Sequence, residues 1–421
     1  MKFTIVIPTR ERMDTLEWSI KTCLCQDYED FEVLVSDNAS QDGTADLVKS
    51  FSDPRIRYIN TGKRLGMSQN WEFALSHVEA SYVFFMGDDD GLLPDALQKA
   101  NQLLTEYQVD ALTWKKASYS WPNCINSNAQ NCLVISLRRG VELRNSEQML
   151  RRVCDFDPTL RGTSYEQLPG LYNSFVAISA IDKARSQTGK FFCSQIPDVY
   201  SAIALTSSVK TYAYSDRPLS INGASSHSNG TSYMKSPKGA TSAKFLSEDN
   251  IPFHPDILLA PSIPVILTES VWQVRDNIQN CEDYDVNLEK FIAEAHRLSA
   301  TRTKEGREMV DAALDRACEA RGYDRRSATN DANNSTSRKI RRLRHTAVKR
   351  FENYIFSYLK QFQISEVSNV YEASLFCQKT AKRNRAFMLA GSVINRISKR
   401  WKSRTVLAKL DRDVQDKTAL Y

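Results

Sequence analysis

The sequence predicts an α/β protein, a doubly wound sheet followed by a helical extension at the C-terminal end. Strand and helix patterns alternate through about the first hundred residues, which is the order of elements in such a sheet. The run FTIVIP, residues 3–8, is continuously apolar and rich in β-branched side chains, as expected of a strand buried on both faces of a parallel sheet. With 421 residues, 42% of them hydrophobic, the chain can bury a sizeable core and exceeds the usual size of one domain.

The other elements follow in order along this first part of the chain. The second strand is FEVLVSD, and shorter apolar runs provide three more strands. The first helix carries Leu16, Ile20 and Leu24 on one stripe, and the helix that ends at Tyr107 begins at Pro94, a residue favoured in a first helical turn. The expected strands are residues 3–8, 31–37, 55–59, 82–86 and 111–114. The expected helices are residues 14–25, 44–51, 67–77 and 94–107.

Polar residues stand at the ends of three of these strands. Ligands of a doubly wound sheet bind at the carboxyl ends of its strands, near the point where the strand order reverses. The first strand is followed by Thr9 and Arg10, the second ends at Asp37 and Asn38, and the fourth runs into FFMGDDDGLLP, residues 84–94. All three polar clusters are therefore expected at one edge of the sheet.

The three consecutive aspartates, Asp88, Asp89 and Asp90, need an explanation because adjacent carboxylates repel one another and are costly to bury. A divalent cation would relieve the repulsion, since Mg²⁺ and Mn²⁺ are usually held by one or two carboxylates while phosphates and waters supply the other ligands. The alternative is a solvated turn in which Asp90 helps to begin the next helix. A similar choice applies to Asp37, as a ligand of a ribose or base or as part of a cap and turn.

Four segments taken together are more specific evidence of function than any single motif. IVIPTRER, SDNASQDGT, RLGMSQNWEFAL and FFMGDDDGLLP resemble, in order and spacing, the signature of family 2 of the inverting glycosyltransferases, which have the GT-A fold. The resemblance covers residues 2–107 well and thins towards residue 236. It implies a GT-A type doubly wound mixed sheet like that of the nucleotide-diphospho-sugar transferases. Residues 1–115 would then be the nucleotide-sugar-binding half and residues 116–236 the acceptor-binding half.

The resemblance also implies roles for individual residues. The nucleotide or its diphosphate is expected to contact Thr9, Glu11, Asp37, Asn38, Arg64, Gly66, Asn70, Asp88 and Asp89. A bound Mg²⁺ or Mn²⁺ ion is expected at Asp90 and Asp88, with Asp90 as the preferred direct ligand and Asp88 or Asp89 directed to ribose or water. Many members of the family have a further aspartate where this chain has Gly87, which leaves the direct ligand open.

The mechanism implied is a direct displacement at the anomeric carbon of a nucleotide-diphosphate sugar. The family places the base near the start of a helix in the second half, and IPDVYSAIAL, residues 196–205, makes Asp198 the candidate. The alternative for Asp198 is an N-cap of that helix. A uridine diphosphate sugar is the expected donor, with guanosine or deoxythymidine diphosphate sugars as alternatives. The acceptor is expected to be a glycan or a lipid-linked saccharide in bacterial polysaccharide assembly.

Two groups downstream have both a functional and a structural interpretation. The loop NGASSHSNGTS, residues 222–232, could close over the donor with His227 at the diphosphate, or it is a surface loop with a solvated histidine. Trp114, Tyr119 and Trp121 could form an apolar platform for a sugar, but core packing is favoured.

The C-terminal part differs in composition. Residues 237–324 read as a mainly helical extension, 325–339 as a polar linker and 340–421 as a basic helical tail. Residues 338–404 hold 17 Lys or Arg against 3 Glu, and segments 349–362 and 386–404 also carry aromatic residues, which suits helices on an anionic membrane surface. Packing against the acidic main body, or oligomerisation, is an equal alternative. Nucleic acid is not an expected partner, because no recognised binding module surrounds the charges.

The remaining features bound the location and the class of protein. The 9 scattered cysteines fit reduced thiols, and the N-terminal apolar run is too short for a signal peptide, so a cytoplasmic protein is expected, possibly peripheral on the inner face of the membrane. A nucleotidyltransferase would need a glycine-rich loop after the first strand, which PTRERMD lacks. A phosphohydrolase would place its aspartates after the first strand. A binding or scaffold protein with an inactive transferase domain remains the non-enzymatic alternative.

Overall fold

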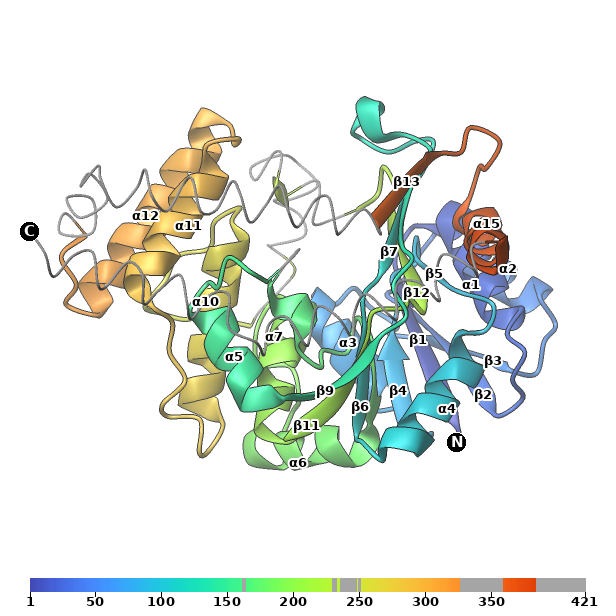
Figure 1. The fold of residues 1–421 in the computed structure, drawn as a ribbon, viewed down its shortest axis with the longest axis horizontal. Coiled ribbons are helices and arrows are strands. Elements are labelled where there is room, and N and C mark those ends of the chain that lie inside the picture. Colours follow the sequence, from blue (N-terminus) through green and yellow to red (C-terminus); the bar gives the residue numbers. More distant parts are fainter. Residues whose placement is uncertain (161–163, 229–232, 235–247, 249–250, 326–358, 384–421) are drawn as a thin grey trace, which may run out of the picture.

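The structure is a computed structural model in which residues 1–160, 164–228, 233–234, 248, 251–325 and 359–383 are described. An eight-stranded mixed sheet forms the centre of the molecule, and a five-stranded sheet adjoins it (Figure 1). The predicted doubly wound α/β architecture with a helical C-terminal extension is confirmed.

The large sheet has the strand order β3-β2-β1-β4-β10-β6-β11-β9. Its strands are β1 (Phe3–Thr9), β2 (Phe31–Asp37), β3 (Ile56–Asn60), β4 (Tyr82–Phe85), β6 (Ala111–Trp114), β9 (Val141–Asn145), β10 (Ser174–Ala177) and β11 (Thr211–Ser215). β1 lies between β2 and β4 and is parallel to both, with Thr9 opposite Asp37. β10 runs antiparallel to its neighbours β4 and β6, which makes the sheet mixed.

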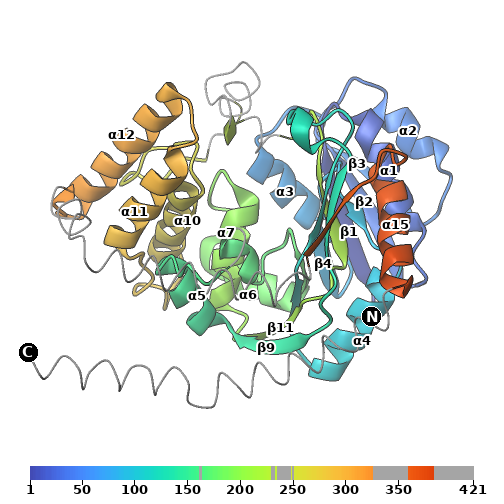
Figure 2. The same ribbon diagram turned by 45° about the horizontal axis from the view of Figure 1, so that its top comes forward.

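Helices cover both faces of this sheet (Figure 2). Alternate residues of β1 point to opposite faces, so Phe3 and Ile5 pack with Leu16 of α1, whereas Val6 packs with Trp71 of α3 on the other face. The helices up to residue 204 are α1 (Met13–Leu24), α2 (Thr44–Ser50), α3 (Met67–Leu75), α4 (Ala96–Tyr107), α5 (Ser146–Cys154), α6 (Ile178–Thr188) and α7 (Pro197–Ala204). Short 3₁₀ turns occupy Ser127–Ala129, Ser164–Gln167 and Leu205–Ser207.

The five-stranded sheet has the order β13-β8-β7-β12-β5. Its strands are β5 (Gly91–Leu92), β7 (Ala117–Ser120), β8 (Cys132–Ser136), β12 (Ser220–Ala224) and β13 (Leu359–Gln363). β5, β7 and β12 each follow directly on a strand of the large sheet, namely β4, β6 and β11. The small sheet therefore continues from the carboxyl ends of three strands of the large sheet, at the edge where the polar clusters were expected.

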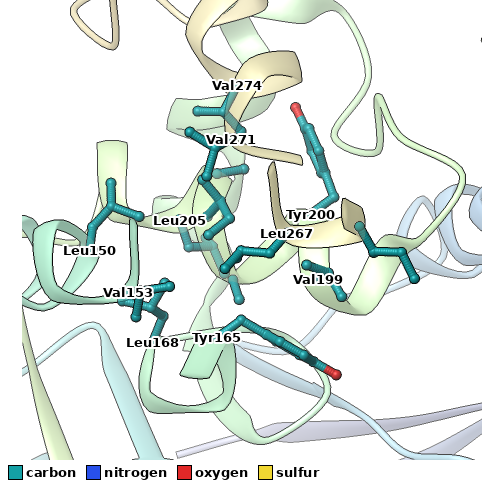
Figure 3. Packing of buried hydrophobic residues seen from close by; sticks show 14 of the residues in the cluster. Leu150, Val153, Tyr165, Leu168, Val199, Tyr200, Leu205, Leu267, Val271 and Val274 are labelled. Atoms are coloured by element: carbon teal, nitrogen blue, oxygen red, sulfur yellow. The ribbon is translucent and has the colours of Figure 1, made fainter. Parts of the chain in front are cut away.

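The helical extension packs on the second half of the α/β domain, residues 116–236. It contains α10 (Ile263–Asn277), α11 (Leu288–Ser299) and α12 (Lys304–Ala320). Figure 3 shows Leu267 and Val271 of α10 among Val199 and Tyr200 of α7 and the following Leu205, all of them buried. Because α7 carries Asp198, the extension supports the helix that bears the candidate base.

The structure changes the interpretation of the C-terminal tail. Residues 359–362, expected to be helical, belong to β13, which pairs antiparallel with β8. The following helix α15 (Val370–Arg383) packs against α1 and β5. Of the two alternatives for the tail, packing against the main body therefore holds for residues 359–383. Residues 340–358 and 384–421, including the basic segment 386–404, lie outside the described residues, as does nearly all of the linker 325–339.

Several smaller expectations can also be compared with the structure. Trp114 and Tyr119 are fully buried and Trp121 is almost so, which confirms core packing over a sugar platform. The helix expected from Pro94 begins at Ala96, because Pro94 and Asp95 form a turn between β5 and this helix. The strands that complete both sheets after residue 115 were not predicted.

All 9 cysteines are free. Among the described residues, no helix combines the length and apolarity needed to cross a bilayer.

Glu269 of α10 is a buried carboxyl group held only by neutral donors. Ser194 donates to Oε2 at 2.7 Å and Gln273 donates to Oε1 at 2.9 Å. Burial raises the pKa of Glu269 from 4.5 to about 7, so the native state binds a proton more tightly than the unfolded chain. The stability that this provides is present below pH 4.5 and is lost as the pH rises through about 7.

In Glu269→Gln the stability should no longer fall as the pH rises through about 7. The free energy of unfolding at pH 8 is therefore expected to rise by up to roughly 3 kcal/mol. Chemical denaturation at a series of pH values measures the effect. The exposed Glu282→Gln is the matched control and should leave the pH dependence unchanged. Equal pH dependence in the parent and Glu269→Gln would show that Glu269 is ionised throughout.

Candidate active site

A cavity of about 670 Å³ opens at the carboxyl ends of the central strands. Its donor-side wall comes from the loop after β1, the start of α3 and the loop between β4 and β5. Its other walls come from β12 with the loop that follows, α7, and the beginning of α10. The polar clusters predicted from the strand ends thus meet in one place.

The aspartate triplet lies in the loop between β4 and β5, and its three side chains have separate partners. Asp88 faces the loop after β1: Thr9 donates a hydrogen bond to its Oδ2 at 2.8 Å, and Arg12 forms an ion pair with its Oδ1 at 2.9 Å. Burial raises the pKa of the Asp88 carboxyl, and the Arg12 guanidinium opposes that rise. Arg12 also donates to the carbonyl oxygen of His227 at 2.5 Å, so it connects the two sides of the cavity mouth.

Asp89 holds the loop after β12. Its Oδ2 accepts hydrogen bonds from the hydroxyl of Ser225 at 2.6 Å and that of Ser228 at 2.9 Å. Among the residues that the structure describes, none donates a hydrogen bond to its Oδ1, and Asp89 lines the cavity. Asp89 thus fixes the loop with one oxygen and leaves the other available to a ligand.

In Asp90, by contrast, both carboxylate oxygens accept hydrogen bonds from protein donors. Its Oδ2 accepts from the backbone of Gly87 at 3.0 Å and from Tyr172 at 2.5 Å. Its Oδ1 accepts from the backbone of Gly223 at 2.6 Å and from Asn222 at 3.2 Å. Burial and the neighbouring Asp89 raise the pKa of Asp90 to about 6. Asp90 is not among the residues that line the cavity.

This geometry favours Asp89 over the predicted Asp90 as the direct ligand of a metal ion. Both oxygens of Asp90 are already occupied by hydrogen-bond donors, whereas the side chains of Asp88 and Asp89 line the cavity. The free Oδ1 of Asp89, beside the carboxylate of Asp88, fits the hard oxygen ligands that Mg²⁺ and Mn²⁺ prefer. No group of three or more His, Cys, Asp or Glu side chains in the described ranges could enclose a metal by itself. A cation here would accordingly take one or two protein ligands.

Two glycines allow the acidic loop to pack in this way. A Cβ on Gly223 would lie 1.8 Å from the carbonyl oxygen of Asp89, which no other residue could accommodate without moving the loop. A Cβ on Gly87 would lie 2.9 Å from Oδ2 of Asp90. The departure from the family pattern at Gly87 therefore makes room for the enclosed Asp90 carboxylate.

Most residues expected at the nucleotide do line the cavity. They are Thr9, Glu11, Asn38, Arg64, Gly66, Asn70, Asp88 and Asp89. Glu11 forms an ion pair with Arg64, and Asn38 exchanges hydrogen bonds of 2.8 Å with the backbone of Leu65. These contacts join the loop after β1, the end of β2 and the segment before α3.

Asp37 is the exception among the expected nucleotide residues. It is buried at the end of β2, where it accepts hydrogen bonds from Tyr58 at 2.6 Å, Asn60 at 3.1 Å and the backbone of Ser40 at 2.9 Å. It is not among the cavity-lining residues. The hydrogen bond from Ser40 places Asp37 in the turn after β2, and its contact with a nucleotide stays a prediction.

Asp198 also lines the cavity, in the first turn of α7. Ile196 is the N-cap and Pro197 is the first helical residue, so the interpretation of Asp198 as the N-cap is wrong. Tyr165 donates a hydrogen bond to its Oδ2 at 3.2 Å. Burial raises the pKa of Asp198, while Lys116 opposes the rise. A carboxylate with a raised pKa that faces a cavity has the properties of a general base.

Sequence reasoning missed three residues of this site: Arg12, Lys116 and Tyr172. Arg12 stands in the quoted motif IVIPTRER, and Lys116 follows the strand that ends at Trp114. A search for polar residues just after each predicted strand could therefore have found both. Tyr172 precedes the antiparallel β10, and the sequence holds no signal for that reversal. His227 lines the cavity, with its Nε2 3.4 Å from Asp14.

Comparison with known proteins agrees with this geometry for the N-terminal part of the chain. Residues 4–152 match the profile of the family described as glycosyl transferase family 2. This part of the chain is similar to glycosyltransferase family 2. The family 2 segment contains the loop after β1, the segment before α3 and the acidic loop, but it ends before Asp198.

Curated relatives share the same segment. The glucosyltransferase of Campylobacter jejuni named GalNAc(5)-diNAcBac-PP-undecaprenol beta-1,3-glucosyltransferase is 37% identical over 108 residues, 24% of this chain and 35% of that protein. The Escherichia coli enzyme WfgD, named UDP-Glc:alpha-D-GlcNAc-diphosphoundecaprenol beta-1,3-glucosyltransferase, is 29% identical over 128 residues, 30% of this chain and 47% of that protein. The chain thus matches less than half the length of these relatives.

Solved structures of low similarity include TarS of S. aureus, residues 1–349. It is 16% identical, with a TM-score of 0.41 over 76% of this chain and 89% of that one.

Proposed function

We propose that this protein is a metal-dependent inverting glycosyltransferase that moves a sugar from a nucleotide-diphosphate donor to a glycan or lipid-linked acceptor in polysaccharide assembly. The observation that carries the proposal is that the acidic loop, in the segment matching family 2, and Asp198 line one and the same cavity. A donor bound on one wall would present its anomeric carbon to an acceptor activated on the other.

The donor wall combines the residues that a nucleotide diphosphate needs. Arg12 and Arg64 supply positive charge, and Asp88 and Asp89 supply oxygens for a Mg²⁺ or Mn²⁺ ion. When bound, such an ion would stabilise the negative charge that grows on the departing diphosphate. Asn38 and Asn70 supply polar groups at the end of the cavity formed by β2 and α3.

The acceptor wall is different in character. Met234, Leu259, Ile263 and Ile266 give it a largely apolar surface beside Asp198. Apolar side chains suit an acceptor that carries a hydrophobic group, and the names of the relatives from C. jejuni and E. coli specify saccharides linked to diphosphoundecaprenol. A lipid-linked saccharide is therefore the acceptor class that we propose. Contact of the basic C-terminal segments with an anionic membrane, from the cytoplasmic side, belongs to the same proposal.

In the transfer step, Asp198 would accept the proton of the acceptor hydroxyl as its oxygen attacks the anomeric carbon. The bond to the nucleotide diphosphate breaks on the opposite face of the sugar, so the configuration inverts. Tyr165 orients the Asp198 carboxylate through its hydrogen bond. Arg12 and Arg64 would bind the nucleotide diphosphate while its bond to the sugar breaks.

Calorimetric titration of the full chain tests the donor half of the proposal. Uridine, guanosine and deoxythymidine diphosphates are titrated with and without Mn²⁺, and we expect one of them to bind at least about tenfold more tightly with the metal. Uridine diphosphate is the expected nucleotide. Binding of none of the three by folded protein would favour the inactive scaffold instead, and equal binding with and without metal would remove the metal dependence.

A further inference from the structure

Lys116 contacts two residues near the cavity, Glu166 and Tyr172, but does not itself line the cavity. It follows β6, and only 10% of its side chain is exposed. Its Nζ forms an ion pair with Oε1 of Glu166 at 2.9 Å and lies 4.5 Å from the centre of the Tyr172 ring. These two contacts fix the ammonium group in a largely buried position. A buried charge costs free energy unless it is paired with neighbouring groups.

The partners of Lys116 lead directly to the candidate base. Glu166 belongs to the short 3₁₀ turn Ser164–Gln167, in which the preceding residue Tyr165 donates a hydrogen bond to Asp198. One turn thus holds Lys116 through Glu166 and Asp198 through Tyr165. On its other side Lys116 lies over Tyr172, whose hydroxyl donates to Asp90.

The charges around Asp198 can be named from each element that faces it. Tyr165 and Glu166 come from the 3₁₀ turn, Lys116 comes from the segment after β6, and Tyr172 precedes β10. Burial raises the pKa of Asp198, Glu166 adds to the rise, and Lys116 is the largest influence that lowers it. Tyr165 is neutral, because its own pKa is raised well above the ordinary value.

We propose that Lys116 is a positioning residue for the transfer reaction, whose fixed ammonium group keeps Asp198 in the ionised form that accepts the acceptor's proton. The inference rests on the proposed function, since it assigns Lys116 a role only if Asp198 is the base. Lys116 acts through Asp198, because it is not among the residues that line the cavity and so does not reach the donor. Without Lys116 the pKa of Asp198 would rise further, and a smaller fraction of the base would be ionised at a given pH.

The test measures the ionisation of Asp198 without turnover. The infrared carbonyl band of a protonated carboxyl group, recorded against pH, is assigned to Asp198 by its loss in Asp198→Asn. In Lys116→Met we expect the midpoint of this band to move to higher pH, and in Lys116→Arg we expect it to stay near the parent value. For each unit of rise, the ionised fraction below the midpoint falls about tenfold.

Two further variants keep the test decisive. Lys115→Met removes a charge from the adjacent residue and should leave the midpoint unchanged. Lys116→Gln, which can still donate to Glu166, replaces Lys116→Met if that variant does not fold by near-ultraviolet circular dichroism. A midpoint that stays at the parent value in the folded Lys116 variant overturns the inference, as does an equal shift in Lys115→Met.

Turnover then separates this inference from the proposed function. With an active enzyme, the acid limb of the pH profile of kcat should move to higher pH in Lys116→Met and return in Lys116→Arg. Transfer by Asp198→Asn at the parent rate would refute the base assignment itself. A moved infrared midpoint with an unmoved acid limb would show that Lys116 acts on Asp198 but not on the reaction, which also overturns the inference.

Discussion

Asp198→Asn is expected to lower kcat for sugar transfer by about 10²- to 10⁴-fold, the usual contribution of a general base. The amide keeps the size of the carboxylate and can still accept the hydrogen bond from Tyr165, but it cannot take a proton. No hydrogen bond or ion pair joins Asp198 to the acidic loop among the described residues, so the Kd of the nucleotide should stay within about twofold of the parent value. The measurement uses the nucleotide sugar selected by calorimetry and a polyprenyl-diphosphate-linked saccharide.

The stability of this variant provides an internal control. Because burial raises the pKa of Asp198, the ionised carboxylate at neutral pH destabilises the native state relative to a neutral side chain. Asp198→Asn should therefore melt at the parent temperature or above it. The exposed Asp182→Asn on α6 should change neither activity nor melting. Transfer by Asp198→Asn within tenfold of the parent would mean that another group is the base.

Asp89→Asn is expected to abolish the metal-dependent part of nucleotide binding, at least a tenfold loss of affinity in the presence of Mn²⁺. The reason is that Oδ1 of Asp89 is the carboxylate oxygen in the acidic loop that lines the cavity without a protein donor among the described residues. An amide is a weaker ligand for a hard cation than a carboxylate. Calorimetry with and without Mn²⁺ measures the change directly.

Asp90→Asn is the matched comparison and should behave differently. Each oxygen of Asp90 accepts from a backbone N–H group, of Gly87 or of Gly223, so an amide NH₂ would face a donor in either orientation. We expect a loss of roughly 1–3 kcal/mol in the free energy of unfolding, with the Mn²⁺ dependence of nucleotide binding retained. Loss of metal dependence in Asp90→Asn but not in Asp89→Asn would restore Asp90 as the direct ligand.

The sequence predicted the nucleotide-binding half of the fold well because that half is made of local, regular patterns. The strands of β1, β2 and β4 are buried on both faces, which leaves continuous apolar runs such as FTIVIP. The half after residue 115 could not be read in this way. Its strands are short, and β10 reverses direction between β4 and β6, so neighbours in the sheet are distant in the chain.

The sequence predicted where the candidate site lies, but not which of its carboxylates faces the cavity. The rule of strand ends brought together Thr9, Asn38 and the acidic loop, since parallel strands end at one edge. Which aspartate faces the cavity depends on Gly223 and Tyr172, which come from two distant elements. The sequence spacing of Asp88, Asp89 and Asp90 holds no information about those contacts.

The pairing of β13 with β8 has a consequence for the biosynthesis of the protein. Leu359–Gln363 completes the sheet whose strand β12 supplies Asn222 and Gly223 to Asp90, and Val370 of α15 lies against Gly91. Contacts so remote in sequence form late, after the domains ahead of them have been synthesised. Residues 359–370 must therefore have left the ribosome before the sheet beside the acidic loop gains these contacts.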